Sequence, residues 1–93
     1  MYVLEDTVLP DILADYGFNY DKELNSWFID CYSTHIPNKP YEVRVGRFLV
    51  VDRKLYVKKF IEAHKESFDK LVSRVINELL QAKIIKEVKE NEN

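Results

Sequence analysis

The chain has 93 residues, of which 46% are hydrophobic and 32% are charged, and its formal net charge is −2. This length corresponds to one small domain, and the apolar content excludes a disordered chain. The single cysteine, Cys31, excludes an intramolecular disulfide, and the longest uncharged apolar run, 48–51, is too short to cross a bilayer. We expect one domain over 1–93 with a frayed tail at about 90–93, cytoplasmic and without a signal peptide.

Residues 7–16 have the spacing of a short helix. Four apolar side chains recur at helical intervals there, namely Leu9, Ile12, Leu13 and Tyr16. Gly17 follows at once, where a helix commonly ends in the left-handed conformation. The pattern predicts an N-terminal helix.

Residues 26–34 alternate as a β-strand does. One predicted face carries Trp27, Ile29 and Cys31, and the other carries Phe28, Asp30 and Tyr32. Residues 18–20 are a candidate hairpin partner for this strand. Both assignments place aromatic side chains on two sides of the same sheet.

A second strand is predicted over 41–51, after a turn at 37–40 that contains two prolines. Its apolar alternation changes parity at Gly46, because Val43 and Val45 precede it while Phe48 and Val50 follow it at even positions. A β-bulge at Gly46 would return all of these side chains to one face.

The segment 53–66 has two interpretations. It is a hairpin with a third strand at 55–57, or a helix that begins at about 56. The loop 52–54 lacks glycine and asparagine, which weakens the hairpin. We therefore favour the helix, which leaves room for a short strand before it, and keep the hairpin as the alternative.

The clearest helical pattern covers 67–82. Its apolar stripe consists of Phe68, Leu71, Val72, Val75, Ile76, Leu79 and Leu80. Residues 84–88 either extend this helix or form a closing strand. Together these elements predict an α+β fold: an N-terminal helix, a small antiparallel sheet of two to four strands, and a long amphipathic C-terminal helix packed on one sheet face.

Catalytic and metal-binding motifs are not evident in the sequence. Cys31 and His35 would need a third group and an open site to act as nucleophile and base, and a buried Cys31 is the simpler interpretation. His64 forms no paired-ligand motif with them, and Gly17 and Gly46 are isolated, which excludes a glycine-rich phosphate loop. We expect no catalytic residue, no metal and no cofactor, and hence no enzyme.

Charge is divided unevenly along the chain. Residues 1–40 are mainly acidic, whereas 43–59 hold six cations against Asp52 alone. The cations of this basic segment are Arg44, Arg47, Arg53, Lys54, Lys58 and Lys59. With Tyr56 and Phe48 interleaved, such a segment can bind phosphates and stack bases, which predicts a nucleic-acid-binding module.

Aromatic residues are concentrated in 16–41, and a small core cannot bury all of them. We expect Phe28 and Tyr32 to remain outside the core, where they would anchor a protein partner. Our first hypothesis is therefore a non-enzymatic interaction protein, a regulator or inhibitor of the kind that phages and mobile elements encode. Nucleic-acid binding through 44–59 is the alternative, and a homodimer through the last helix is a third. No membrane partner is expected.

Overall fold

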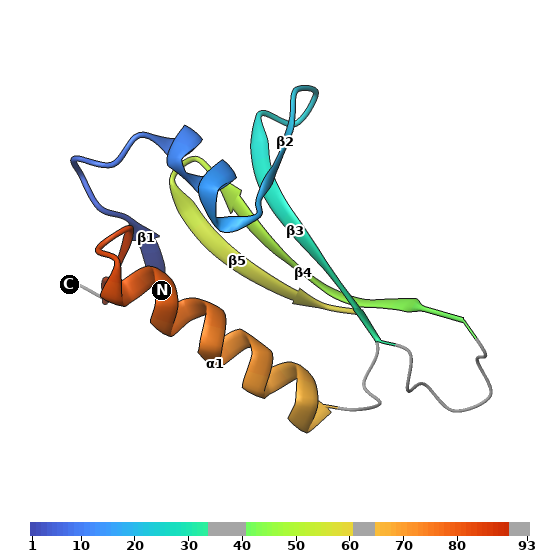
Figure 1. The fold of residues 1–93 in the computed structure, drawn as a ribbon. Helices are drawn as coiled ribbons and strands as arrows, with labels where there is room; N and C mark the ends of the chain where they lie inside the picture. The colour runs from blue at the N-terminus through green and yellow to red at the C-terminus, as the bar shows by residue number, and fades with distance from the viewer. Residues whose placement is uncertain (34–40, 61–64, 90–93) are drawn as a thin grey trace.

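The computed structural model describes residues 1–33, 41–60 and 65–89, which form one antiparallel sheet with a helix on one side (Figure 1). The sheet has six strands in the order β2-β3-β4-β5-β1-β6. The strands are β1 (Tyr2–Leu4), β2 (Asn19–Asp21), β3 (Ser26–Ser33), β4 (Val43–Val51), β5 (Lys54–Lys59) and β6 (Ile85–Glu87). A 3₁₀-helix, η1 (Pro10–Tyr16), and an α-helix, α1 (Lys65–Gln81), complete the fold.

The fold predicted from the sequence is wrong. The sheet contains six strands instead of two to four, no α-helix precedes it, and the C-terminal helix has 17 residues and is followed by a further strand. The predicted fold had a small sheet and two helices. In the structure the sheet is the main body of the part of the chain that is described.

The sequence did not indicate β1, a strand of three residues. β1 lies between β5 and β6, with Tyr2 opposite Leu55 on one side and opposite Glu87 on the other. Its partners are more than 50 positions away in the sequence. Short strands of this kind are stabilised by pairing with distant segments, which local periodicity does not reveal.

The segment predicted as an N-terminal helix forms η1. Its hydrogen bonds are tight, with Ile12 N donating to Leu9 O at 3.1 Å, and Gly17 ends it with a φ of 90°. Leu13 is fully buried, whereas Leu9 is 71% exposed. Leu13 alone anchors η1 in the core. The apolar spacing therefore indicated a helical segment correctly, but the segment forms a short 3₁₀-helix and not an α-helix.

The bulge predicted at Gly46 is present. Cys31 lies opposite Gly46 and Tyr32 lies opposite Arg44, so Val45 is the extra residue on β4. Val45 and Phe48 are consequently buried on the same side of the sheet. A Cβ at Gly46 would overlap the ring of Phe68 and would lie 2.8 Å from the carbonyl oxygen of Lys58, so glycine lets α1 approach the sheet closely.

The segment after Asp52 is a hairpin strand, so the favoured helix from about 56 is wrong. Residues Asp52 and Arg53 form a two-residue loop in which both have positive φ, 51° and 64°. This conformation suits the twist of two paired strands, although glycine and asparagine adopt it at lower cost. Pairing of the whole of β5 with β4 offsets that cost.

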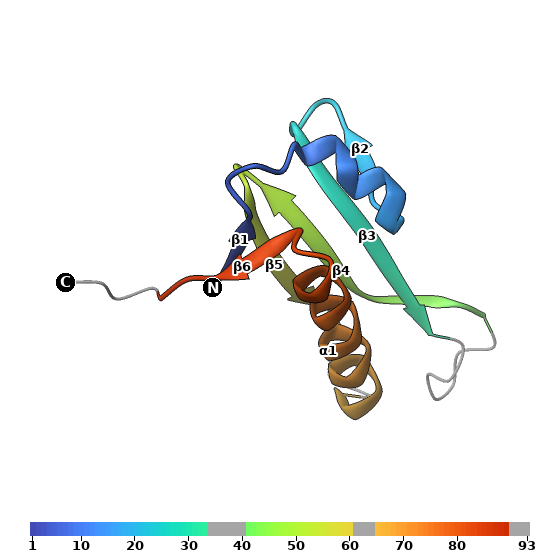
Figure 2. The ribbon, with the colours of Figure 1, turned by 60° about the vertical axis from the view of Figure 1, so that its left-hand side comes forward.

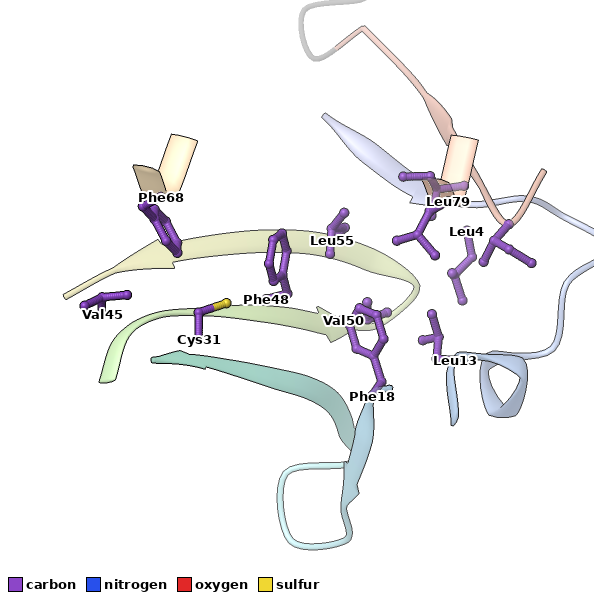
Figure 3. Close-up of a cluster of buried hydrophobic side chains, with 12 residues drawn as sticks. Leu4, Leu13, Phe18, Cys31, Val45, Phe48, Val50, Leu55, Phe68 and Leu79 are labelled. Carbon is purple, nitrogen blue, oxygen red and sulfur yellow. The ribbon is translucent and has the colours of Figure 1, made fainter. Parts of the chain in front are cut away.

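Helix α1 packs its apolar stripe on the sheet, and Figures 2 and 3 show the helix and the resulting core. Phe68 and Leu79 of α1 are buried with Phe48, while Leu13 of η1 closes the other end. The helix ends at Gln81, and Lys83 after it is left-handed, with Ile84 N donating to Leu79 O at 2.9 Å. The chain then enters β6, which confirms the closing-strand alternative for 84–88.

None of the helices within the described ranges is long and apolar enough to cross a membrane.

Candidate binding surface

The register of the strands assigns each side chain to one of two faces. Residues directly opposite each other in an antiparallel pair point to the same side. Ile29, Phe48 and Val57 form one such row on the side that α1 and η1 cover. The rows between them point to the other side, which no described helix covers (Figure 2).

We call this second side the open face. Its central side chains, from β3, β4, β5 and the residue after β5, are Phe28, Asp30, Tyr32, Arg44, Arg47, Leu49, Lys54, Tyr56, Lys58 and Phe60. Across the strands they form an apolar row, Phe28–Leu49–Tyr56, next to a charged row, Asp30–Arg47–Lys58. Lys54 lies on the other side of the apolar row. The apolar row of the open face therefore has cations on both sides, with Arg47 and Lys58 in one neighbouring row and Lys54 in the other.

Six of the eight residues predicted to bind a partner lie together on the open face. They are Phe28, Tyr32, Arg44, Arg47, Lys54 and Lys58. The other two lie elsewhere. Lys59 points to the helix side, where its Nζ lies 3.2 Å from Asp69 Oδ1 and above the ring of Phe68. Arg53 is in the β4–β5 turn.

Arg53 is held by the main chain of the N-terminal segment. Its Nη2 donates to the carbonyl oxygen of Glu5 at 2.6 Å. It also lines an open pocket of about 230 Å³ beside Trp27, Val50 and Pro10, at one end of the sheet. These contacts give Arg53 a structural role at the junction of η1 and the hairpin.

Asp30 lies between two arginines on the open face. Arg47 binds it through two parallel hydrogen bonds, Nε to Oδ1 at 2.6 Å and Nη2 to Oδ2 at 3.1 Å, and Arg44 Nη1 lies 3.6 Å from Oδ2. The hydrogen bond from Arg47 is the main reason that the pKa of Asp30 is lowered, and the same bond raises the pKa of Arg47. The carboxylate thus holds one arginine firmly and the other loosely.

The two arginines also cover aromatic rings. The guanidinium carbon of Arg47 lies 4.6 Å from the centre of the Phe28 ring, and that of Arg44 lies 4.8 Å from the centre of the Phe60 ring. Phe28 is half-buried as a result, whereas Tyr32 is 54% exposed. The predicted anchor pair is therefore divided: Tyr32 is accessible and Phe28 supports Arg47.

A line of three exposed side chains of the open face runs along β5. Lys54, Tyr56 and Lys58 alternate with residues of the helix side, and all three are exposed, Tyr56 by 40%. Within the described ranges neither lysine makes an ion pair, in contrast to Arg47 and Lys59. All three residues are present in the basic segment of the sequence, but they share one face only if β5 is a strand. In the helix that we favoured from the sequence, Tyr56 and Lys58 would point in different directions. Phe48, the other aromatic of the basic segment, is fully buried.

The acidic and basic halves of the sequence do not form two separate surfaces. β3 from the acidic half pairs with β4 from the basic half, which places Asp30 between Arg47 and Arg44. At the margin of the open face, Lys86 is paired with Asp6, with 3.1 Å between Nζ and Oδ1. The central side chains of the face nevertheless include four cations against one carboxylate, Asp30. The surplus of three positive charges contrasts with the net charge of −2 for the chain.

Cys31 lies in the core among Phe48 and its neighbours (Figure 3). Burial is the main cause of the raised pKa of its thiol, and nearby Asp30 raises it further, so the reactive thiolate is disfavoured. His35 and His64 lie outside the described residues. Within the described ranges, no group of three or more histidine, cysteine or acidic side chains could hold a metal ion.

Comparison with known proteins supplies no relative. No family model, no curated protein and no solved structure matches this chain. The function must therefore be inferred from the geometry of the open face.

Proposed function

We propose that this protein is a non-enzymatic binding module that holds an anionic macromolecule on the open face of its sheet. The surplus of positive charge on that face, in a chain with a formal net charge of −2, carries this proposal. A local cationic surface attracts partners of the opposite sign even when the whole molecule is slightly negative. Lys54 and Lys58 are the central contacts, since no described carboxylate neutralises them.

The geometry favours a charged partner over an apolar protein surface. The anchor pair that an apolar contact would use is incomplete, because Arg47 covers Phe28. The apolar stripe that a helix-mediated homodimer would use packs on the sheet of the same chain. An acidic protein has the same chemistry as other polyanions and is an alternative outcome of the tests below.

Chromatography on immobilised heparin, a sulfated polyanion, tests the proposal. At low ionic strength the protein should be retained, and the retention should decrease with salt because ions screen exposed charges. The double substitution Lys54→Glu with Lys58→Glu should abolish retention. The matched control, Lys70→Glu with Lys83→Glu, makes the same charge change at exposed positions of α1 and the segment after it, and should retain more of the affinity.

Two results would contradict the proposal. The first is a wild-type protein that passes through the column at low salt. The second is an equal loss of retention in the two double variants, since that would show an effect of total charge rather than of the open face.

A further inference from the structure

We infer that the anionic macromolecule is a single-stranded nucleic acid, with a base stacked on Tyr56 and phosphates bound by Lys54 and Lys58. This inference depends on the function proposed above and specifies its partner. It restricts the base-stacking role that the sequence suggested for Tyr56 and Phe48 to Tyr56, because Phe48 is fully buried. The argument depends on how the rows of the open face are arranged and on which aromatic ring is free.

The spacing along β5 suits a chain that alternates apolar and charged groups. Lys54, Tyr56 and Lys58 are every second residue of one strand, so the two lysine Cα atoms are separated by roughly 13 Å with the tyrosine midway. A single strand of nucleic acid presents phosphates along its backbone and flat base surfaces beside them. Positive side chains along the backbone, combined with aromatic rings under the bases, are the usual means of binding it without sequence preference.

Tyr56 is the aromatic ring of the central rows that is available for stacking. Arg47 lies above the ring of Phe28, and Arg44 above that of Phe60. Tyr56 is 40% exposed, and no arginine or lysine covers its ring within the described ranges. Its neighbour Leu49 separates it from Phe28 and continues the apolar row. A base stacked on Tyr56 would thus also contact Leu49 and would lie between Lys54 and Lys58.

Tyr32 and Arg44 offer a second contact of the same type on the open face. Tyr32 is 54% exposed and lies directly opposite Arg44, whose side chain is 46% exposed. Arg44 is held only loosely by Asp30, at 3.6 Å. A strand bound at Tyr56 could continue past Lys58 towards this pair, which extends the interface along the sheet.

A duplex fits this face less well. Its bases are stacked on each other, so Tyr56 would have no base surface to contact, and its sequence is usually read by a helix or a ribbon entering a groove. The one α-helix of the described ranges lies on the other side of the sheet with its apolar stripe buried. Only phosphate contacts would remain, and those do not distinguish a tyrosine from an alanine.

Fluorescence anisotropy with a labelled 20-nucleotide oligothymidine, the corresponding single-stranded RNA and a 20-base-pair duplex tests the inference. Both single strands should bind more tightly than the duplex. Tyr56→Ala should weaken binding by about fivefold or more, as expected for loss of one stacked base, while Tyr56→Phe should bind like the wild type. Tyr32→Ala should give a smaller loss.

The salt dependence of the affinity distinguishes phosphate binding by the lysines from base stacking by Tyr56. Each phosphate contact contributes about 0.7 to the slope of log K against log salt for single strands. Lys54→Ala and Lys58→Ala should each reduce that slope by roughly this amount. Tyr56→Ala should lower affinity at every salt concentration and leave the slope unchanged. Circular dichroism of each variant verifies that the fold is intact.

The outcomes distinguish the two proposals. Retention on heparin together with equal binding of strand and duplex, or of Tyr56→Ala and Tyr56→Phe, would overturn this inference and leave the proposed function standing. Tighter binding of a labelled polyglutamate than of either strand would overturn it in the same way and indicate an acidic protein. Failure to bind heparin and both strands at low salt would overturn both.

Discussion

The two faces of the sheet are made from the same strands but are held together by different forces. On the helix side, Phe48 and Leu79 are buried in an apolar core, and no charged side chain is among the buried residues of the described ranges. On the open face, Asp30 and Arg47 are bound to each other while Lys54 and Lys58 remain in solvent. The difference shows that the buried core and the exposed lysines are assigned to alternate residues of the same strands, so Lys54 and Lys58 can be altered with little effect on the packing of the core.

The largest effect should come from a core residue. Phe48→Ala removes a fully buried ring and should lower the free energy of unfolding by about 3–5 kcal/mol. Leu49→Ala, at the neighbouring position on the open face, should cost less because Leu49 is only partly buried. Urea denaturation measures both. Equal losses at the two positions would show that the faces are not distinct in packing.

The second prediction concerns the ion pair of the open face. Asp30→Asn should reduce stability by roughly 1.5–3 kcal/mol at neutral pH, because it removes charge-assisted hydrogen bonds to Arg47. The pKa of Asp30 is lowered in the folded protein, so its stabilising effect is complete above the pKa of the unfolded chain and is lost as the pH falls through the folded value.

The difference in stability between the wild type and Asp30→Asn should therefore narrow as the pH falls below about 4. Urea denaturation at neutral pH and at pH values below 4 measures this difference. A difference that stays constant with pH would contradict the role assigned to Asp30.

The third prediction tests the close approach of α1. Gly46→Ala should destabilise the fold by about 1–3 kcal/mol, since the added methyl group would overlap the ring of Phe68 and the main chain of β5. Replacing Phe68 by leucine in the same chain should recover part of the loss, because a smaller side chain leaves room. Thermal unfolding of the two single variants and the double variant gives this coupling. Strict additivity would argue against direct contact between the two positions.

The smallest effect on stability should come from the two lysines that we propose as binding residues. Lys54→Ala and Lys58→Ala should each change the free energy of unfolding by no more than about 0.5 kcal/mol, because both side chains are exposed and unpaired with any described residue. The same variants should lose heparin retention measurably. A large change in stability would place these lysines in the structural framework and would blur the distinction between the faces.

Local patterns in the sequence were sufficient for several elements. The alternation around β3, the change of parity at Gly46 and the apolar stripe of α1 each reflect contacts with one neighbouring element, and each is found in the structure. The hairpin at Asp52 and Arg53 was misjudged because neither residue is typical of its positive φ. That error also concealed the row formed by Lys54, Tyr56 and Lys58.

By itself, the sequence determined the strand periodicity, the position of the bulge, the buried face of the last helix and the residues from which a cationic surface could be built. Only the tertiary structure decided that β1 and β6 complete a six-stranded sheet, that Arg53 and Lys59 do not lie on the open face, and that Asp30 neutralises Arg47. The physical reason is the separation along the chain between the residues that interact. Periodicity records what each segment buries, whereas the pairing of β1 with β5 and β6 and of Asp30 with Arg47 joins residues distant in the chain, and their energies arise only when the sheet has formed.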